Sequence, residues 1–263
     1  MKELMKKYGI RPSKRLGQNF LTNKGIAEKV IKAASIDPQD IVLEVGPGLG
    51  ILTRELAEKA KRVIAVEKDS GLSGLLSKEY ENLKNLEIIN QDILSFNPDI
   101  KKYKVVANLP FYITSPVIRK FLEKDFPPEI MVLIVQKEVA QRIIAKPPKM
   151  NLLAVSVQVY AEPKIISYIS KGSFYPAPKV DAAILKLTPE SKLSLPKLSL
   201  LFKIARAGFS HPRKQLVGNL SKELKIEKER IAEWLKKNNI DPARRAETLS
   251  MDDWLNLSNE SRS

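Results

Sequence analysis

Cysteine is absent from this 263-residue chain, and histidine occurs once, at His211. The missing thiols exclude disulfides, iron–sulfur clusters, cysteine-based zinc sites and thiolate nucleophiles. A zinc-dependent base deaminase is excluded with them, because its metal needs two or three cysteine ligands. A single histidine cannot hold a metal by itself, and the adjacent Pro212 predicts a surface position for it. We therefore expect no metal centre and no catalysis by a thiol or an imidazole.

Long apolar runs are also missing from the chain. No window approaches the roughly 18 consecutive apolar residues that are typical of a transmembrane helix. Residues 1–7 are basic but lack the apolar core of a signal peptide. These absences predict a cytoplasmic protein, long enough for one large domain and a smaller one.

Acidic residues are outnumbered, since 30 Asp and Glu stand against 45 Lys and Arg, which gives a formal net charge of +15. Such an excess favours a polyanionic partner, because phosphate neutralisation supplies most of the non-specific affinity for nucleic acid. Basic residues are concentrated in residues 1–15 and 200–215. The nucleic-acid contacts that we predict from these segments are Lys14, Arg15, Arg206, Arg213 and Lys214. A solvated, lysine-rich surface is the alternative for each segment.

Short apolar runs alternate with helical stretches along the first 190 residues. The predicted strands are 41–45, 62–66, 86–90, 104–107 and 130–135, with two more near 163–169 and 181–187. This alternation predicts an α/β fold in which crossover helices join parallel strands. Between the last two strands, residues 174–179 are expected to form a proline-stiffened loop. Only helical patterns follow, so we predict a domain of residues 1–190, with a basic arm at 1–20, and a helical domain of residues 191–263.

A glycine-rich turn, Gly46-Pro47-Gly48-Leu49-Gly50, follows the first predicted strand. Glycines there let the backbone turn sharply and approach a ligand closely. A dinucleotide fingerprint needs its third glycine at position 51, which is Ile51, so NAD and FAD are disfavoured. The spacing resembles the loop of S-adenosylmethionine-dependent methyltransferases instead. We predict that Gly46 and Gly48 contact the cofactor; an ordinary tight turn is the alternative.

Acidic side chains follow the next two predicted strands. Glu67 stands 21 positions after Gly46, where a carboxylate can accept hydrogen bonds from both hydroxyls of a ribose. Asp92 follows the third strand and can accept from the adenine amine of the cofactor. The alternatives are a solvated carboxylate for Glu67 and a turn or helix cap for Asp92. Since three successive strand ends carry these groups, we expect them to bind one molecule of S-adenosylmethionine.

Asn108-Leu109-Pro110-Phe111 follows the fourth predicted strand and places an amide, a backbone carbonyl and an aromatic ring side by side. The lone pair of a nucleobase amine is delocalised into its ring, so methyl transfer requires the nitrogen to be held in position. The Asn108 oxygen and the Leu109 carbonyl can accept the two amine hydrogens, and Pro110 stiffens the turn. Phe111 or Tyr112 can stack on a flipped base. The alternative is a polar strand cap before a proline turn.

Together these motifs resemble a known family, the small-subunit ribosomal RNA adenine dimethyltransferases, which are similar in turn to the erythromycin-resistance methyltransferases of large-subunit RNA. The matching runs follow one another along nearly the whole chain. They are Leu16 to Leu21, Glu44 to Gly50, Asn108 to Phe111, Gln136 to Val139, Phe174 to Ala182 and Ile240 to Ser250. One departure is visible, because Phe111-Tyr112 stands where the family often has Tyr-Asn. It leaves open which of the two aromatic rings stacks on the base.

The resemblance implies a Rossmann-like, seven-stranded S-adenosylmethionine-dependent methyltransferase sheet with a small C-terminal all-helical domain. It implies dimethylation of the exocyclic amines of two adjacent adenosines near the 3′ end of small-subunit ribosomal RNA, on a pre-ribosomal particle. The cofactor contacts that it implies are Asn19, Leu21, Gly46, Glu67, Asp92 and Asn108. It assigns base stacking to Phe111, with Tyr112 as a further RNA contact. We expect the protein to act as a monomer.

Two other functions stay open. A large-subunit RNA adenine methyltransferase that confers macrolide resistance shares most of these motifs, although the segment from Asp241 to Glu247 favours the small-subunit enzymes. A non-catalytic ribosome-assembly or RNA-binding factor on the same fold is the third reading. Such a factor need not retain Asn108 or the glycine turn, and this chain has both.

Overall fold

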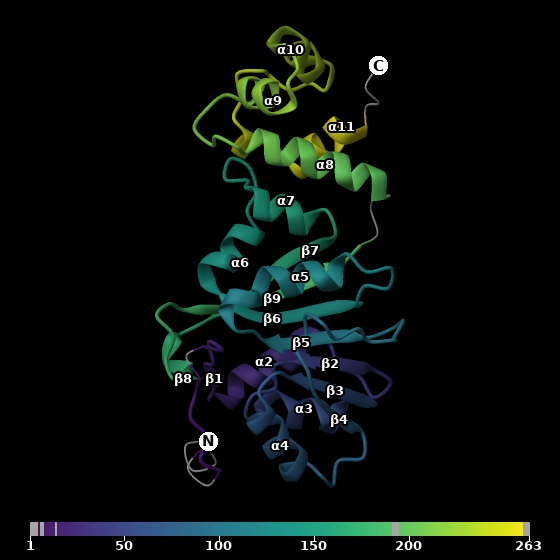
Figure 1. Cartoon of the computed structure of the whole chain (residues 1–263), viewed down its shortest axis with the longest axis vertical. Helices are drawn as coiled ribbons and strands as arrows, with labels where there is room; N and C mark the ends of the chain where they lie inside the picture. Colours follow the sequence, from purple (N-terminus) through teal and green to yellow (C-terminus); the bar gives the residue numbers. More distant parts are fainter. Residues whose placement is uncertain (1–4, 6–7, 14, 191–194, 260–263) are drawn as a thin grey trace. The chain divides into compact units, whose positions relative to one another are not determined.

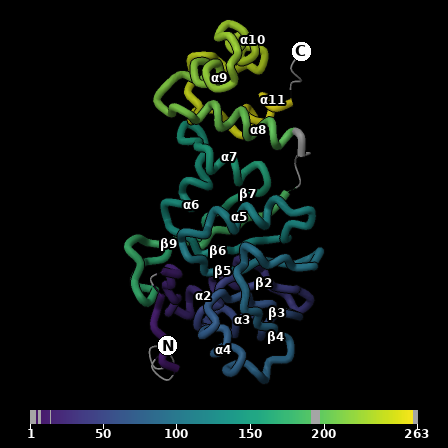
Figure 2. The backbone as a smooth tube through the Cα atoms, in the orientation of Figure 1, coloured from purple at the N-terminus to yellow at the C-terminus, as the bar shows by residue number. Residues whose placement is uncertain are grey.

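The computed structural model describes residues 5, 8–13, 15–190 and 195–259. The chain divides into two compact units (Figure 1, Figure 2). The first unit takes the chain as far as Ala140 together with Pro163–Pro189. The second takes Gln141–Glu162 together with the chain from Glu190 onward. Two segments that are distant in the sequence therefore build the second unit.

The first unit is built around a seven-stranded sheet with the strand order β4-β3-β2-β5-β6-β9-β7 (Figure 1). The strands are β2 (Ile41–Val45), β3 (Arg62–Glu67), β4 (Leu86–Asn90), β5 (Lys104–Asn108), β6 (Ile130–Gln136), β7 (Ala161–Ile169) and β9 (Ala182–Pro189). This confirms the predicted α/β class and the seven-stranded sheet. On the central strand β5, Val105, Val106 and Ala107 are fully buried, as expected of a strand that is covered on both faces.

Pairing within the sheet is mixed. β2 pairs in parallel with β3 and β5, and the pairs β3–β4 and β5–β6 are parallel as well. The predicted parallel pairing does not extend to β9, which runs antiparallel to β6. Between β7 and β9 the chain forms a short turn, η2 (Lys171–Ser173), and a short strand, β8 (Phe174–Tyr175), but no α-helix. It thus returns to the sheet without the crossover helix that a parallel neighbour needs.

Helices accompany the parallel strands. α2 (Lys24–Ala34) leads into β2, and α6 (Lys137–Ile143) follows β6. α3 (Ile51–Lys59), α4 (Ser70–Glu79) and α5 (Thr114–Leu122), the last preceded by the turn η1 (Phe111–Ile113), each join two of the strands. The Asn23 side chain caps α2 by accepting a hydrogen bond from the backbone of Ile26. α2 and α3 bury their apolar faces with the sheet in one cluster that includes Val30, Leu56 and Val106. This packing fixes the glycine-rich turn between β2 and α3.

A second, two-stranded sheet holds the N-terminal segment. β1 (Phe20–Leu21) pairs antiparallel with β8, so that Leu21 lies opposite Phe174. Figure 2 shows the purple N-terminal segment beside the green segment that contains β8. The prediction of a loop over residues 174–179 was therefore wrong for its first two residues. Two residues are too few for a strand pattern, and the pairing depends on a partner more than 150 positions away in the chain.

The second unit is helical in its described C-terminal part. Its helices are α7 (Leu152–Gln158), α8 (Leu195–Gly208), α9 (Leu216–Leu224), α10 (Lys228–Lys237) and α11 (Met251–Asn259), with the turn η3 (Ala246–Thr248) before the last. Trp254 is fully buried at the centre of their shared core and packs on Phe209, with ring centroids 5.2 Å apart. None of the helices in the described ranges is long and apolar enough to cross a membrane.

Candidate active site

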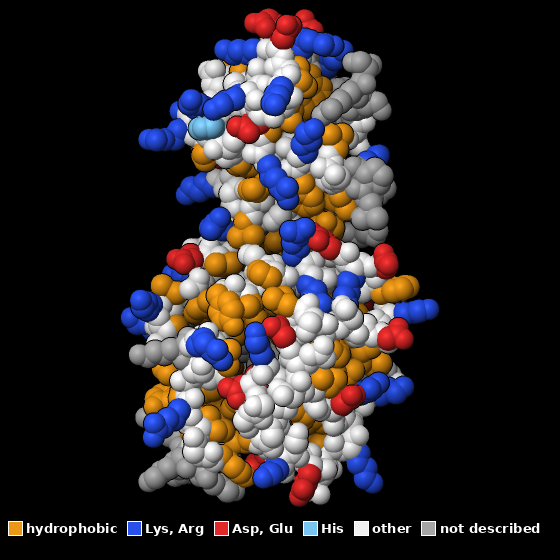
Figure 3. All heavy atoms as spheres, in the orientation of Figure 1, with side chains coloured by type: hydrophobic (Ala, Val, Ile, Leu, Met, Phe, Trp, Pro, Cys, Tyr) orange, Lys and Arg blue, Asp and Glu red, His pale blue; other side chains and the backbone are white. Residues whose placement is uncertain are grey.

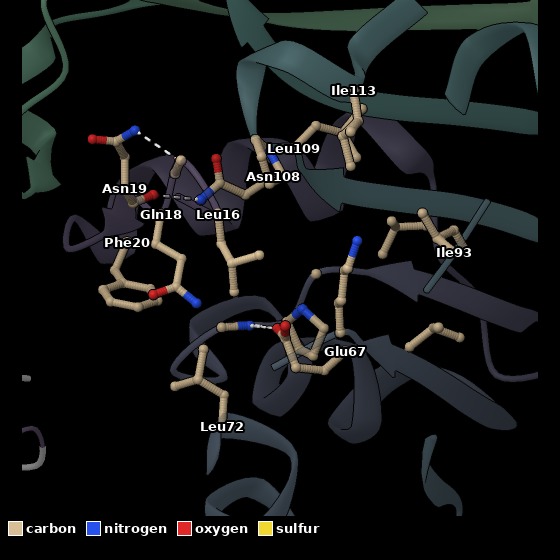
Figure 4. Close-up of a pocket in the computed structure, with 18 of the residues that line it drawn as sticks. Leu16, Gln18, Asn19, Phe20, Glu67, Leu72, Ile93, Asn108, Leu109 and Ile113 are labelled. Carbon is tan, nitrogen blue, oxygen red and sulfur yellow. Dashed lines mark hydrogen bonds between the residues drawn. The ribbon is translucent and has the colours of Figure 1, made fainter. Parts of the chain in front are cut away.

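The carboxyl ends of β2, β3, β4 and β5 open onto one pocket (Figure 4). The chain order reverses at β2, whose two neighbours are β3 and β5, and open α/β sheets bind ligands at such a point. The predicted cofactor and base contacts that line this pocket are Asn19, Leu21, Gly46, Gly48, Glu67, Asp92, Asn108, Leu109, Pro110, Phe111 and Tyr112. The fold thus gathers in one place residues that the sequence separates by nearly a hundred positions.

The glycine turn has a backbone that side chains would disturb. Gly46, Gly48 and Gly50 have φ angles of 67°, 61° and 80°, in the left-handed region that favours glycine. A Cβ atom on Gly48 would lie 3.0 Å from the ring of Phe20. Any larger residue at position 48 would both strain the backbone of the turn and displace the Phe20 ring. The turn therefore presents bare backbone to the pocket.

Glu67 ends β3 and is bonded to the glycine turn. Its Oε2 accepts a hydrogen bond from the backbone of Gly48 at 3.1 Å (Figure 4). Its Oε1 accepts one from the backbone of Asp69 at 2.9 Å. The side chain is buried, and burial raises the pKa of the Glu67 carboxyl above its ordinary value, against the opposing effect of these bonds. Each carboxylate oxygen has a second lone pair, so Glu67 can hold the turn and accept from ligand hydroxyls together.

Asp92 follows β4 and lines the same pocket as Glu67. Its Oδ1 accepts a hydrogen bond from the backbone of Leu94 at 2.9 Å, as the turn-cap alternative predicts. Its Oδ2 accepts from the Lys68 Nζ at 2.8 Å. The hydrogen bond from Lys68 lowers the pKa of the Asp92 carboxyl, and the bond from Leu94 adds to this effect. Asp92 thus caps a turn and also faces the pocket as an ionised acceptor.

Asn108 ends β5, and its amide is held by the N-terminal segment. The Asn108 Nδ2 donates a hydrogen bond to the backbone oxygen of Asn19 at 3.0 Å (Figure 4). Because the amide nitrogen makes this bond, the amide oxygen is the atom left to accept from a ligand. Beyond it, the backbone of Ile113 donates to the Pro110 oxygen at 3.1 Å and closes the turn η1. The motif is therefore a fixed structure in which the orientation of the Asn108 amide is set.

The N-terminal segment contributes pocket residues that the sequence alone did not single out. The Gln18 Nε2 donates to the Asp69 carboxylate at 3.0 Å, which ties the segment to the start of α4. Phe20 packs with Leu49 and Leu72 in a small apolar cluster, and Phe174 lines the pocket from β8. From the sequence, the runs that contain Gln18, Phe20 and Phe174 are family signatures without an assigned contact for these three residues. The β1–β8 pair, which contains Phe20 and Phe174, brings the two runs together at the pocket.

The two neighbouring aromatic residues have different surroundings. Phe111 is half-buried and packs against the apolar cluster of α2, α3 and the sheet. Tyr112 is 58% exposed, and its ring lies against Gly17, where a Cβ atom would approach it to 3.3 Å. Both line the pocket. Phe111 is thus a fixed wall, and Tyr112 an exposed ring at the pocket mouth.

Glu44 is a buried carboxyl near the end of β2, two residues before Gly46. It is 1% exposed, and neither of its oxygens has a hydrogen-bond partner among the described residues. Burial, with a smaller contribution from the nearby Glu67 charge, raises the pKa of Glu44 to about 8 against the opposing effect of the Thr53 hydroxyl. Glu44 is therefore largely protonated at neutral pH. No sequence pattern predicts this protonation, because it depends on burial in the folded protein.

The predicted basic contacts fall on both units. Arg15 is exposed near the pocket of the first unit, whereas Lys14 lies outside the described residues. Arg206, Arg213 and Lys214 are exposed on the second unit, along α8 and the turn after it. His211, predicted at the surface, is half-buried, with its Nδ1 3.2 Å from the Ser210 hydroxyl. On the face seen in Figure 3, basic side chains predominate over acidic ones on that unit.

Metal ligands do not cluster in the described part of the chain, where no group of three or more acidic or histidine side chains could hold an ion. The pocket instead combines bare backbone, a buried carboxylate at Glu67, an oriented amide at Asn108 and apolar walls. This arrangement suits a polar organic molecule with hydroxyl and amine donors.

Comparison with known proteins gives consistent results. The chain is 46% identical over 263 residues to a ribosomal RNA small subunit methyltransferase A of Dehalococcoides mccartyi, covering 97% of this chain and 90% of the relative. It is 39% identical over 272 residues to the protein of the same name from Alkaliphilus metalliredigens, covering 98% and 95% of the two chains.

Solved structures agree with these relatives. A dimethyladenosine transferase from Plasmodium falciparum matches with a TM-score of 0.80 and 29% identity, over 90% of this chain and 95% of that one. The 23S rRNA methyltransferase ErmE matches with a TM-score of 0.77 and 26% identity, over 91% and 98%. The sequence profile of ribosomal RNA adenine dimethylases matches residues 10–262. With this match along nearly its whole length, the chain belongs to the ribosomal RNA adenine dimethylase family and is a methyltransferase.

Proposed function

We propose that this enzyme transfers methyl groups from S-adenosylmethionine to the exocyclic amines of two adjacent adenosines near the 3′ end of small-subunit ribosomal RNA. The observation that carries the proposal is the bond between the Asn108 Nδ2 and the Asn19 backbone oxygen, at 3.0 Å. It orients the Asn108 amide so that its oxygen accepts from an incoming amine. A strand cap alone would not need an oriented amide at the wall of a pocket.

The residues around the glycine turn fit S-adenosylmethionine. Gly46 and Gly48 leave room where a side chain would meet neighbouring atoms. Glu67 offers a buried carboxylate for the two ribose hydroxyls, and Asp92 an ionised acceptor for the adenine amine. Asn19 and Leu21 close the pocket from the N-terminal segment. When bound, the cofactor supplies an electrophilic methyl group.

The chain's own residues position the acceptor amine. The Asn108 oxygen and the Leu109 carbonyl accept its two hydrogens, which turns the nitrogen lone pair out of conjugation with the base. Phe111, fixed by the core behind it, provides a ring on which the flipped base stacks. Pro110 sets the turn between these groups. Positioning of this kind requires no side chain with a tuned pKa.

The RNA partner follows from the relatives and from charge. The two relatives reported above, at 46% and 39% identity, are named for the small ribosomal subunit, whereas ErmE, at 26%, is named for 23S rRNA. The net charge of +15 suits a large RNA surface, with Arg15 on the first unit and Arg206, Arg213 and Lys214 on the second. We infer a monomer that acts in the cytoplasm on a pre-ribosomal particle.

The decisive experiment maps methylated adenosines by mass spectrometry in ribosomal RNA from cells with and without this protein. We expect dimethyladenosine near the 3′ end of small-subunit RNA to disappear without it and to return with the wild-type gene. Loss of methylation in large-subunit RNA would select the resistance-type enzyme instead. Unchanged methylation in both RNAs would leave only the role of a binding factor.

A further inference from the structure

Lys68 occupies a place at the pocket mouth to which neither the motifs nor the comparisons assign a role. It directly follows Glu67 at the end of β3, lines the pocket, and has a side chain that is 55% exposed. Its Nζ lies 2.8 Å from Asp92, the residue expected to accept from the cofactor adenine. Lys68 is therefore reachable from solvent and is also ion-paired with a residue expected to bind the cofactor.

The surroundings of Lys68 are those of a nucleic-acid contact. Asp92 raises the pKa of the Lys68 ammonium, and two further groups act on it, Tyr112 raising it and Arg15 lowering it. Tyr112, whose ring is 58% exposed, lines the same pocket as Lys68, and Arg15 is close enough for its charge to act on Lys68. We call Lys68, Asp92, Tyr112 and Arg15 the rim cluster. Two cations beside an exposed aromatic ring match the combination that tracks the backbone and stacks the bases of single-stranded RNA.

We propose that Lys68 binds a backbone phosphate of the RNA beside the flipped adenosine, and that its ion pair with Asp92 makes RNA and cofactor bind cooperatively. The inference rests on the proposed function, because it takes RNA and S-adenosylmethionine as the two ligands. It adds to that function a further RNA contact and a link between the two binding events.

The cooperativity follows from competition for one ion pair. Without ligands, Lys68 and Asp92 neutralise each other. A phosphate that binds Lys68 releases Asp92, and an adenine amine that binds Asp92 loosens its hold on Lys68. Whichever ligand binds first disrupts the pair, so the second meets no competitor, and each strengthens the other by the same factor. Because exposed ion pairs are weak, the factor is small, about two- to fivefold.

The test compares Lys68→Gln with Lys61→Gln. Lys61 is exposed and stands at the opposite end of the same strand, so both changes remove one charge from the surface of the same unit. Binding of a fluorescent RNA fragment from the 3′ end of small-subunit RNA is measured over a range of salt concentrations. Each series is run with and without S-adenosylhomocysteine, and thermal unfolding confirms that both variants are folded.

We expect Lys68→Gln to weaken RNA binding about three- to tenfold at low salt and to lower the slope of log Kd against log salt by about one. The wild type and Lys61→Gln should bind RNA about two- to fivefold more tightly with S-adenosylhomocysteine, and Lys68→Gln should lose this gain. Equal RNA affinity and slope in the two variants would overturn the phosphate contact. Weaker binding with the gain retained would overturn the coupling.

A parallel assay of methyl transfer separates the role of Lys68 from the proposed function. The wild-type enzyme is assayed in parallel for methyl transfer to small-subunit RNA. If it methylates that RNA while Lys68→Gln behaves like Lys61→Gln, only the inference about Lys68 is lost. If the wild type methylates no adenosine there, the proposed function itself fails.

Discussion

The edge of the sheet formed by the amino-terminal ends of its strands differs from the edge formed by their carboxyl-terminal ends in how buried ionisable side chains are paired. At the amino-terminal edge, the Lys104 Nζ lies 2.6 Å from the Asp40 carboxylate and donates to the Ser35 oxygen at 2.7 Å. The same Asp40 oxygen accepts from the backbone of Asp37 at 2.8 Å. At the carboxyl-terminal edge, Glu44 of β2 stands four residues after Asp40. It is buried, and its carboxyl oxygens have no hydrogen-bond partner among the described residues.

This difference separates a structural edge from a binding edge. Asp40 and Lys104 join the starts of β2 and β5 through contacts made within the protein itself. Glu67 and Asn108 end β3 and β5 at the pocket on the other side, where acceptor capacity is left for a ligand, and Glu44 is buried behind the glycine turn at the end of β2. An unpaired buried polar group costs stability, so a fold retains it where function needs it. The four predictions below test this division, from the largest expected effect to the smallest.

Lys104→Met should destabilise the protein by about 3–5 kcal/mol, because it leaves the buried Asp40 carboxylate without its cation. Chemical denaturation measures the free energy of unfolding. The matched control is Lys102→Met, whose side chain is 80% exposed and which should cost less than about 1 kcal/mol. Cofactor affinity of the folded Lys104→Met variant should equal that of the wild type. A loss of cofactor affinity without a loss of stability would contradict the division between the edges.

Asn108→Ala should lower kcat for RNA methylation by about 10²–10³-fold, since it removes one acceptor that holds the amine. Stability should change little, because Asn108 is only half-buried and makes one bond to Asn19. Single-turnover kinetics measures the effect, and Asn97→Ala, an exposed asparagine of the same unit, is the control. Turnover of Asn108→Ala at the wild-type rate would refute the assigned role.

Glu44→Gln should remove a pH dependence of stability. In the folded protein Glu44 keeps its proton up to a pKa of about 8, whereas the unfolded chain releases it near 4.5. The folded state thus binds more protons between these values, and its stability falls as pH rises through that window, by at most about 1.4 kcal/mol per pH unit.

Thermal unfolding between pH 5 and pH 8 measures this slope. The Glu44→Gln variant should show a flatter profile than the wild type, while Glu28→Gln, on an exposed position of α2, should not. Identical slopes in the wild type and Glu44→Gln would mean that Glu44 is ionised in the folded protein.

Phe111→Leu and Tyr112→Leu should separate the two aromatic rings. Phe111 is held by the core beside Asn108, so we expect its loss to lower kcat/KM by about 5–150-fold, the range for one stacked base. Tyr112 lies at the mouth against Gly17, so its loss should raise KM for RNA with a smaller effect on kcat. Steady-state kinetics on an RNA fragment measures both. The reverse ranking in kcat would make Tyr112 the stacking ring.

The sequence determined the parts of this protein that local chemistry fixes. Apolar runs between helical patterns gave the α/β class, and the glycine spacing gave a turn that only glycines form with these φ angles. Missing cysteine excluded whole classes of chemistry. Glu67, Asp92 and Asn108 could be chosen because parallel strands place their carboxyl ends on one edge.

The tertiary structure decided what depends on distant partners. Pairing of Phe20–Leu21 with Phe174–Tyr175 spans more than 150 positions, and two residues carry no strand pattern. The amide of Asn108 is oriented by a backbone oxygen 89 positions earlier, which no spacing reveals. Burial raised the pKa of Glu44, and the fold placed Lys68 beside Asp92. Long-range hydrogen bonds and desolvation act only once the chain has folded, so a sequence pattern cannot show them.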